Sequence, residues 1–323
     1  MKRLIVLCFA FGLQLSGEGR DLGPDVSHYQ GATGVSQAAW NQMYADGNRF
    51  AFVKASEGLT GPDDASMANN VARAAAAGLL VGVYHYPHPE NRTNTAGAVL
   101  EADHFLSYAG SAVGPGRLRP VLDVEGSAAN LSKTGLTDWI IAFSDRIISQ
   151  RGAGAAPIIY MNRSFARDEV DTRLANYDLW IAYYTNVDVS ISQPPPTVSY
   201  PVPTGVFNNW CFWQYSSTGI AGGITPIDLD VCHSEYKTLQ SFLIPYPPLV
   251  ISSITLGNGG TIQIAFTNSP GRSLTALAST NIALPMASWT DLGSVTESPA
   301  GSYQFTDTPA PSIRQRFYRI RSP

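Results

Sequence analysis

Short, nearly continuous apolar runs recur along residues 22–232 and indicate β-strands that are buried on both faces. Six such runs occupy residues 22–27, 49–54, 79–86, 120–124, 157–160 and 178–183, and residues 211–232 add two more as a hairpin. Helix-compatible segments lie between the early runs, at residues 38–45, 67–77, 95–107 and 134–149. Eight strands that alternate with helices predict a parallel sheet closed into a barrel.

The second half of this barrel is expected to be irregular. Loops rather than strong helices connect its later strands, and residues 193–203 are rich in proline. A short helix over residues 234–243 would close the domain. The predicted fold class is therefore α/β, with an irregular TIM-like β/α barrel as the main domain.

The pattern changes after Tyr246-Pro247-Pro248, which we interpret as part of a linker. Short β-prone runs separated by turn residues follow at residues 251–256, 261–266, 274–279, 289–295, 303–306 and 317–321. They predict a small C-terminal β-sandwich. Its aromatic residues are expected in its core rather than on a ligand-binding surface. These residues are Trp289, Phe305, Phe317 and Tyr318.

The N-terminus has the pattern of a secretory signal peptide. Lys2 and Arg3 precede an apolar run from Leu4 to Leu15, and small residues follow at Ser16-Gly17. The run is shorter than the roughly 20 apolar residues that span a bilayer. We therefore predict a signal peptide at residues 1–17, a barrel at 18–244, a linker at 245–249 and a β-sandwich module at 250–323. The mature protein would be secreted or periplasmic, without stable insertion in a membrane.

Charge excludes one class of partner. Without Lys2 and Arg3 the formal net charge moves from −4 to −6. Residues 251–323 carry five Arg and three acidic residues, so residues 18–250 have a net charge of −8. An acidic main domain argues against nucleic acid as a partner.

Two cysteines would remain after processing, Cys211 and Cys232. A hairpin centred on the glycine-rich turn between them would pair residue 213 with 230 and residue 211 with 232. In an exported protein this arrangement predicts a disulfide. A metal site at these cysteines is disfavoured, because it would need more ligands nearby than His233 alone.

The segment from Pro120 to Gly126 carries the most specific chemistry. Asp123 and Glu125 follow an apolar run and are separated by one residue. In an extended strand they would share a face, with Cα atoms roughly 6.6 Å apart. Because two neighbouring carboxylates repel each other, one tends to keep its proton at neutral pH, which is what cleavage of a glycosidic bond requires. The alternative for an isolated pair of this kind is a solvated surface turn.

Polar and aromatic residues recur at the carboxyl ends of the other predicted strands, which meet at one face of a parallel barrel. Carboxylates bind hydroxyl groups and transfer protons, and aromatic rings stack on sugars, so this set suits a glycan substrate. The alternative is a group of separate structural residues. The candidate substrate-binding residues are Lys54, Tyr84, Tyr86, Tyr160, Tyr183, Trp213 and Gln214, beside the acids Asp25, Asp123, Glu125 and Asp228.

Seven dispersed motifs resemble, in order and spacing, those of family 25 glycoside hydrolases, over about residues 21–244. They are Asp25-Val26-Ser27-His28-Tyr29-Gln30-Gly31, Phe52-Val53-Lys54-Ala55-Ser56-Glu57-Gly58, Gly82-Val83-Tyr84-His85-Tyr86, Leu122-Asp123-Val124-Glu125, Ile158-Ile159-Tyr160, Trp213-Gln214-Tyr215 and Ile227-Asp228-Leu229. The resemblance implies a lysozyme with an irregular β/α barrel. It also implies hydrolysis of the β-1,4 bond between N-acetylmuramic acid and N-acetylglucosamine in peptidoglycan strands, without a metal or cofactor.

By this resemblance Glu125 is the general acid and base, and Asp123 stabilises the charge that develops at the sugar or on its 2-acetamido group. Asp25 and Asp228 would shape the electrostatics and position water or the acetamido group. Retention of configuration through the acetamido group is our hypothesis. Two features depart from the family pattern: the segment between Gly31 and Asn48 is differently spaced, and Asp230 stands where the family often has Asn.

Two further functions compete with this one. A catalytically silent glycan-binding protein could use the same scaffold, although a binding module has no need for a proton donor. A hydrolase of another N-acetylated glycan such as chitin is the other alternative. His28, His85 and His88 are interpreted as structural or sugar-contacting residues rather than metal ligands, since Pro87 interrupts the spacing of the last two.

Overall fold

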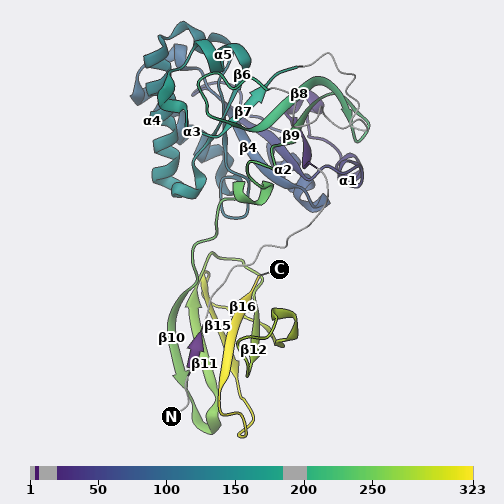
Figure 1. Ribbon diagram of the computed structural model, residues 1–323, viewed down its shortest axis with the longest axis vertical. Helices are drawn as coiled ribbons and strands as arrows, with labels where there is room; N and C mark the ends of the chain where they lie inside the picture. Colours follow the sequence, from purple (N-terminus) through teal and green to yellow (C-terminus); the bar gives the residue numbers. More distant parts are fainter. Residues whose placement is uncertain (1–3, 7–19, 185–201, 323) are drawn as a thin grey trace. The chain divides into compact units, whose positions relative to one another are not determined.

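The computed structural model describes residues 4–6, 20–184 and 202–322. The chain forms two compact units (Figure 1). One unit is Gly17–Pro245, and the other contains Tyr246–Pro323 together with the N-terminal strand. The predicted Pro-rich segment at residues 193–203 lies largely outside the described residues.

The larger unit is a closed eight-stranded barrel, which confirms the predicted fold class. Its strands, in spatial order, are β2 (Leu22–Val26), β3 (Phe50–Glu57), β4 (Leu80–Tyr86), β5 (Val121–Asp123), β6 (Ile158–Asn162), β7 (Leu179–Ala182), β8 (Trp210–Ala221) and β9 (Ile224–Cys232). Each neighbouring pair from β2 to β8 is parallel. Strand β9 is antiparallel to both β8 and β2 and closes the barrel between them. The hairpin of β8 and β9 therefore completes a barrel sheet that is otherwise parallel.

Helices α1 (Gln37–Ala45), α2 (Met67–Ala77), α3 (Thr95–Ala109) and α4 (Lys133–Arg151) connect the early strands, as their apolar spacing predicts. Helix α2 ends at Gly78, whose φ of 102° favours glycine. A short helix, α5 (Arg163–Asp168), was not predicted. The helix predicted over residues 234–243 is wrong. The extended backbone of Thr238 interrupts that segment, and it forms a 3-10 turn at Leu239–Phe242.

Two apolar clusters stabilise the barrel. One lies between the strands and the helices and includes Trp139, Ile140 and Phe143 of α4. The other fills the barrel interior with aromatic rings, among which Phe52 stacks on Trp180 with ring centroids 4.7 Å apart. Because apolar side chains fill this interior, the polar residues at the carboxyl ends of the strands are left to line a pocket.

The smaller unit is a pair of four-stranded sheets with a shared apolar core, which confirms the predicted small β domain. One sheet has the order β10 (Val250–Leu256), β11 (Ile262–Thr267), β15 (Ser302–Asp307) and β14 (Thr296–Glu297). The other has the order β1 (Leu4–Val6), β16 (Arg316–Arg321), β12 (Thr275–Ser279) and β13 (Thr290–Ser294). The four aromatic residues expected in this core are buried, with exposed fractions between 1% and 8%.

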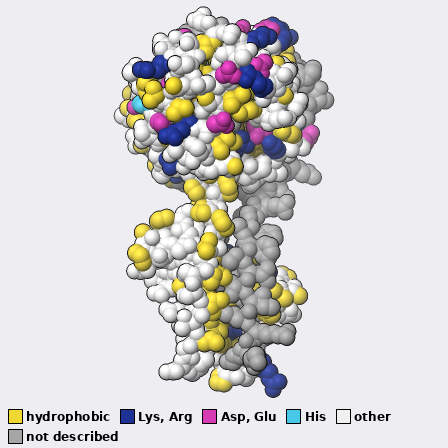
Figure 2. Space-filling model, turned by 90° about the vertical axis from the view of Figure 1, so that its left-hand side faces the viewer, with side chains coloured by type: hydrophobic (Ala, Val, Ile, Leu, Met, Phe, Trp, Pro, Cys, Tyr) yellow, Lys and Arg dark blue, Asp and Glu magenta, His cyan; other side chains and the backbone are white. Residues whose placement is uncertain are grey.

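The N-terminal strand β1 pairs in parallel with β16. Most of the predicted signal peptide, at residues 7–17, lies outside the described residues. Within the described ranges, no helix combines the length and apolar character needed to cross a bilayer. On the face of the barrel unit visible in Figure 2, acidic and basic side chains are intermixed.

The predicted disulfide is absent, because Cys211 and Cys232 are both buried free thiols. The predicted register of the β8–β9 hairpin is wrong by one residue, since Cys232 lies opposite Phe212 rather than Cys211. The thiol of Cys211 instead donates a hydrogen bond to the carbonyl oxygen of Leu179 at 3.2 Å. With this shift the two cysteines are diagonal neighbours across the hairpin rather than a directly opposed pair.

Candidate active site

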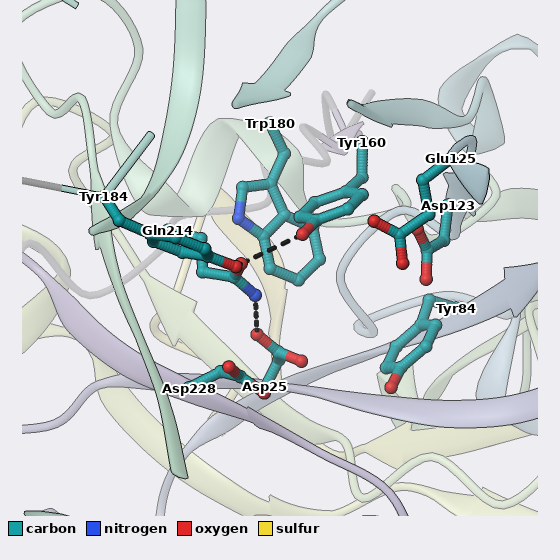
Figure 3. Close-up of a pocket in the computed structure, with 9 residues that line it drawn as sticks. All are labelled: Asp25, Tyr84, Asp123, Glu125, Tyr160, Trp180, Tyr184, Gln214 and Asp228. Atoms are coloured by element: carbon teal, nitrogen blue, oxygen red, sulfur yellow. Dashed lines mark hydrogen bonds between the residues drawn. The ribbon is translucent and has the colours of Figure 1, made fainter. Parts of the chain in front are cut away.

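An acid-lined pocket of about 200 Å³ opens at the carboxyl ends of the barrel strands (Figure 3). Strands β2, β4, β5, β6, β7, β8 and β9, and the segments that directly follow them, contribute to it. The lining residues are Asp25, Tyr84, Asp123, Glu125, Tyr160, Trp180, Tyr184, Gln214 and Asp228. The four predicted catalytic acids therefore meet in one pocket.

Asp123 and Glu125 lie side by side in this pocket, with their carboxyl groups toward its interior (Figure 3). Asp123 is the last residue of β5, and the backbone stays extended through Glu125, at φ −153° and ψ −170°. The backbone N–H of Val124 donates to the carbonyl oxygen of Tyr160 at 2.9 Å, which holds this extension beside β6. Because the chain remains extended, the two acids share a face as the sequence predicts.

Gly126 allows the chain to turn directly after the acids. Its φ is 60°, a conformation that side chains with a Cβ rarely adopt. A Cβ at this position would also lie 2.6 Å from the hydroxyl oxygen of Tyr86. The glycine therefore fixes both the direction of the chain and the close approach of Tyr86 to the acid pair.

Asp25 and Asp228 lie directly opposite each other in the β2–β9 ladder. Gln214 on β8 donates a hydrogen bond from its Nε2 to Oδ2 of Asp25 at 2.7 Å. The Oε1 atom of Gln214 accepts hydrogen bonds from the hydroxyls of Tyr160 at 2.9 Å and Tyr184 at 2.7 Å. These two bonds fix the orientation of the amide, so that its N–H group points to Asp25 (Figure 3).

The environment of the pocket favours protonated carboxyl groups. Burial is the main cause that raises the pKa of both Asp25 and Asp123 well above the usual range. The negative charge of Asp228 raises the pKa of Asp25 further, and that of Glu125 raises the pKa of Asp123 further. Burial also raises the pKa of Glu125, which the positive charge of Lys54 opposes. The pKa of Asp228 is raised to about 6 by burial and by the charge of Glu125. A carboxylic acid can thus persist beside a carboxylate near neutral pH.

Lys54 is the cation next to this acid group. Its Nζ atom lies 2.5 Å from Oε2 of Glu57 and 5.2 Å from the ring centroid of Tyr86. His88 approaches the other carboxylate oxygen of Glu57 at 3.0 Å. We predicted that Lys54 would pair with an acid in the cleft, but its partner is Glu57, outside the pocket lining. Its charge acts on the pocket through space.

Six of the seven predicted substrate-binding residues divide into two groups. Tyr84, Tyr160 and Gln214 line the pocket. Lys54, Tyr86 and Tyr183 are not among the lining residues, although Tyr86 lies beside the acid pair. Their roles toward a substrate stay predictions.

Trp213 cannot serve as a sugar platform, so this assignment is wrong. Its side chain is 1% exposed, belongs to the apolar layer between strands and helices, and donates through Nε1 to the carbonyl oxygen of Tyr183 at 2.7 Å. The reason is the two-residue period of a strand: Gln214 faces the barrel interior, so its neighbour faces the helices.

The same period explains the pocket residues that we did not select. Trp180 and Ala182 face the barrel interior, and Tyr184 continues that face into the pocket. Tyr183, which we selected, lies on the other face, where the guanidinium of Arg163 approaches its ring at 5.7 Å. Assigning residues 180, 182 and 184 to one face would have found Tyr184 from the sequence.

The histidines near the site contact acids and a serine. His85 is fully buried between the hydroxyl of Ser56, at 2.9 Å, and Oε2 of Glu101, at 3.1 Å. His28 contacts Oδ2 of Asp64 at 3.1 Å. No group of three or more histidine, cysteine or acidic side chains in the described part of the chain is placed to hold a metal ion.

The barrel and its convergent acids define a class of enzyme, the glycoside hydrolases, and comparison with known sequences identifies the family. The sequence model of glycosyl hydrolases family 25 matches residues 24–224. The chain belongs to this family.

Individual relatives agree with this assignment. The chain is 31% identical over 232 residues to lysozyme M1 of Streptomyces globisporus, covering 66% of this chain and 71% of that protein. Its structure is similar to that of the bacterial lysozyme from Streptomyces coelicolor, with a TM-score of 0.53, 27% identity and coverage of 67% and 94%. It is also similar to a family GH25 lysozyme from Aspergillus fumigatus, with a TM-score of 0.54, 25% identity and coverage of 70% and 99%.

Proposed function

We propose that this family 25 enzyme is a lysozyme that hydrolyses the β-1,4 bond between N-acetylmuramic acid and N-acetylglucosamine in peptidoglycan. The observation that carries the proposal is the Asp123–Glu125 pair, which faces an acidic pocket at the carboxyl ends of the barrel strands. Peptidoglycan as substrate is supported by the relatives, which are named lysozymes. No cofactor takes part in the reaction.

Glu125 is the general acid. It lies beyond the end of β5 and is partly exposed, so that it can reach the oxygen of a glycosidic bond. Its raised pKa keeps the carboxyl group protonated toward neutral pH, as proton donation to a leaving group requires. After the first step the resulting carboxylate accepts a proton from the incoming water molecule.

Asp123 stabilises the reacting sugar. Its Oδ1 atom is buried and accepts no hydrogen bond from the described residues. A buried acceptor without a partner is costly, and a substrate N–H group can satisfy it. The amide N–H of a 2-acetamido group is the donor that both sugars of peptidoglycan offer. Oriented in this way, the acetamido oxygen can attack the anomeric carbon, so that the product retains its configuration.

Asp25 and Asp228 complete the acidic wall on the opposite side of the pocket. Asp228 is partly exposed and changes charge near pH 6, which allows it to hold a water molecule or the acetamido group. Asp25 is more deeply buried and is held by Gln214. These two residues position groups, whereas Glu125 transfers the proton.

A comparison of wild type with Glu125→Gln tests the proposal. We expect wild type to clear a suspension of purified peptidoglycan and the variant to be slower by about 100-fold or more, since it cannot donate the proton. Glu235→Gln, at an exposed position, is the matched control. Mass spectrometry of the released fragments identifies the bond. Equal clearing by both enzymes would refute the role of Glu125, and failure of wild type to clear would favour the glycan-binding alternative.

Two further arms separate the remaining alternatives. Release of fragments from chitin but not from peptidoglycan would replace the proposed substrate by chitin. An NMR time course of the first anomer formed tests the stereochemistry, and an initial α-product would exclude retention through the acetamido group.

The enzyme is exported, and residues 1–17 are removed as a signal peptide. Strand β1 (Leu4–Val6) is removed with it, so that β16 becomes an edge strand of its sheet in the mature protein. The support is the charged start, the short apolar run and the small residues that follow it. Peptidoglycan, the proposed substrate, also lies outside the cytoplasmic membrane. The N-terminal sequence of the protein recovered from culture medium or periplasm tests this proposal.

A further inference from the structure

A fifth carboxyl group lies behind the pocket. Asp230 on β9 is fully buried and is not among the lining residues. It lies opposite Gln214 of β8 and opposite Gly23 of β2 in the two ladders that β9 forms. Because it is two residues from Asp228, it faces the barrel interior, one step deeper than the pocket acids.

One oxygen of Asp230 has a defined donor. The indole Nε1 of Trp180 donates to its Oδ1 at 2.8 Å. The other oxygen, Oδ2, is buried and receives no hydrogen bond from an N–H or O–H group of any described residue. Asp25 is the diagonal neighbour of Asp230 on the interior face of the β2–β9 ladder, so that a hydrogen bond can join the two carboxyl groups. Two ionised carboxylates have no proton with which to form such a bond, so one of the pair must be a carboxylic acid.

The surroundings decide which residue carries the proton. Asp25 accepts the hydrogen bond from Nε2 of Gln214 and borders the pocket, where solvent and substrate can stabilise a charge. Asp230 is enclosed by Trp180, Gln214 and the aromatic interior of the barrel. An isolated negative charge is most costly at the more enclosed position.

We propose that Asp230 is a protonated positioning residue, whose O–H group donates a hydrogen bond to Asp25 and holds that carboxylate ionised and oriented toward the pocket. The inference rests on the proposed function, because it assigns a role within the same site. Burial, followed by the charges of Asp25 and Asp228, raises the pKa of Asp230 well above the usual range and supports a neutral side chain.

The groups that face Asp230 are consistent with one shared proton. Asp25 faces it from β2 and Asp228 from its own strand, and both are acids. Trp180 on β7 and Gln214 on β8 contribute N–H donors but no positive charge. Because none of these facing groups is a cation, two adjacent carboxylates would repel each other, and a proton between them removes this repulsion.

An asparagine can reproduce the neutral form of Asp230. Its carbonyl oxygen can accept from Nε1 of Trp180, and its N–H group can donate to Asp25. Leucine has a similar volume but can do neither. Asp230→Asn and Asp230→Leu therefore form a matched pair that separates hydrogen bonding from space filling.

We expect Asp230→Asn to retain kcat on peptidoglycan within about threefold, and Asp230→Leu to lose about 10-fold to 100-fold, as for loss of a hydrogen bond to a buried charged group. The apparent KM should change little in either variant, because Asp230 does not line the pocket. Difference infrared spectroscopy of wild type and Asp230→Asn at neutral pH should show one buried carboxylic-acid carbonyl band that the variant lacks. A merely space-filling residue would not give this band.

Two results would overturn the inference: a wild-type spectrum without a carboxylic-acid band assigned to residue 230, or equal activities for the Asn and Leu variants when both remain folded by thermal melting. If Asp230→Leu does not fold, the infrared difference and the activity of Asp230→Asn still test whether Asp230 is protonated and donates a hydrogen bond. Glu125→Gln, measured in parallel, keeps the two proposals apart. Equal activity of that variant and wild type refutes the proposed function, while the infrared comparison still tests the state of Asp230.

Discussion

The amide of Gln214 reaches across strand β9 to donate a hydrogen bond to Oδ2 of Asp25 at 2.7 Å. The two residues lie on β8 and β2, the strands that β9 joins antiparallel when the barrel closes. Two tyrosine hydroxyls hold the amide in the orientation in which it can donate. Closure of the barrel therefore also places a donor beside a buried catalytic-site acid.

Gln214→Leu tests this arrangement. The substitution removes the donor to Asp25 and leaves the hydroxyls of Tyr160 and Tyr184 without their acceptor. We expect kcat/KM on peptidoglycan to fall by about 10-fold to 100-fold, since hydrogen bonds to buried charged groups contribute about 1.5–3 kcal/mol. The rate of turbidity loss measures the effect, and Gln263→Leu, at an exposed position in the smaller unit, is the control. Unchanged rates would show that Asp25 does not depend on this donor.

Lys54 should set the pH range of activity through its positive charge. Its positive charge lowers the pKa of Glu125 and also opposes the increase at Asp123. In Lys54→Met this effect is lost and Glu57 keeps a negative charge nearby, so the pKa of Glu125 should increase. The protonated acid then persists to higher pH, and the alkaline limb of the kcat profile should move to higher pH.

A pH series of initial rates from acidic to alkaline buffers measures this shift. Lys133→Met, at the first residue of α4, removes a positive charge that is not among the causes of the pKa shifts of Asp123 and Glu125, and it should leave the profile unchanged. A shift of the alkaline limb to lower pH in Lys54→Met would contradict the proposed electrostatic role.

The sequence is sufficient to predict the barrel because its strands are marked by two independent signals. Apolar runs of suitable length identify strands that are buried on both faces, and an acid or aromatic residue follows several of them. The extended spacing of Asp123 and Glu125 is a local property, so its consequence could be predicted correctly. The positions of Asp25 and Asp228 follow once eight strands are placed in a barrel.

The incorrect predictions arise where a shift of one residue along a strand changes the face to which a side chain points. Trp213 was selected for its chemistry, but strand alternation directs it away from the pocket that Gln214 lines. The same alternation places Tyr184 rather than Tyr183 in the pocket lining, although a role of Tyr183 toward a substrate stays a prediction. The disulfide failed for the same reason, because the irregular register of β8 and β9 is a property of the folded hairpin. The inward direction of Asp230 follows from its two-residue spacing to Asp228, but its contacts with Trp180 and Gln214 depend on neighbouring strands, which no local pattern encodes.

Asp228 should make the stability of the folded protein depend on pH. Its pKa is about 6 in the folded protein, above the ordinary value of 3.8, so the folded state binds this proton more tightly than the unfolded state. The free energy of unfolding should therefore fall as pH rises from about 4 to about 6, and the loss should persist at higher pH. Asp228→Asn removes this titration. Near pH 4 the two proteins should have similar stability, whereas at pH 7 the variant should be more stable by on the order of 2 kcal/mol, while its hydrolytic activity is reduced.

Denaturant unfolding of both proteins at pH 4, 5, 6 and 7 measures the difference, with Asp145→Asn on the exposed face of α4 as the control. Parallel stability curves for wild type and Asp228→Asn would show that the charge of Asp228 costs the fold nothing. A difference in the free energy of unfolding that grows between pH 4 and pH 6 would show that ionisation of Asp228 in the acidic pocket destabilises the fold.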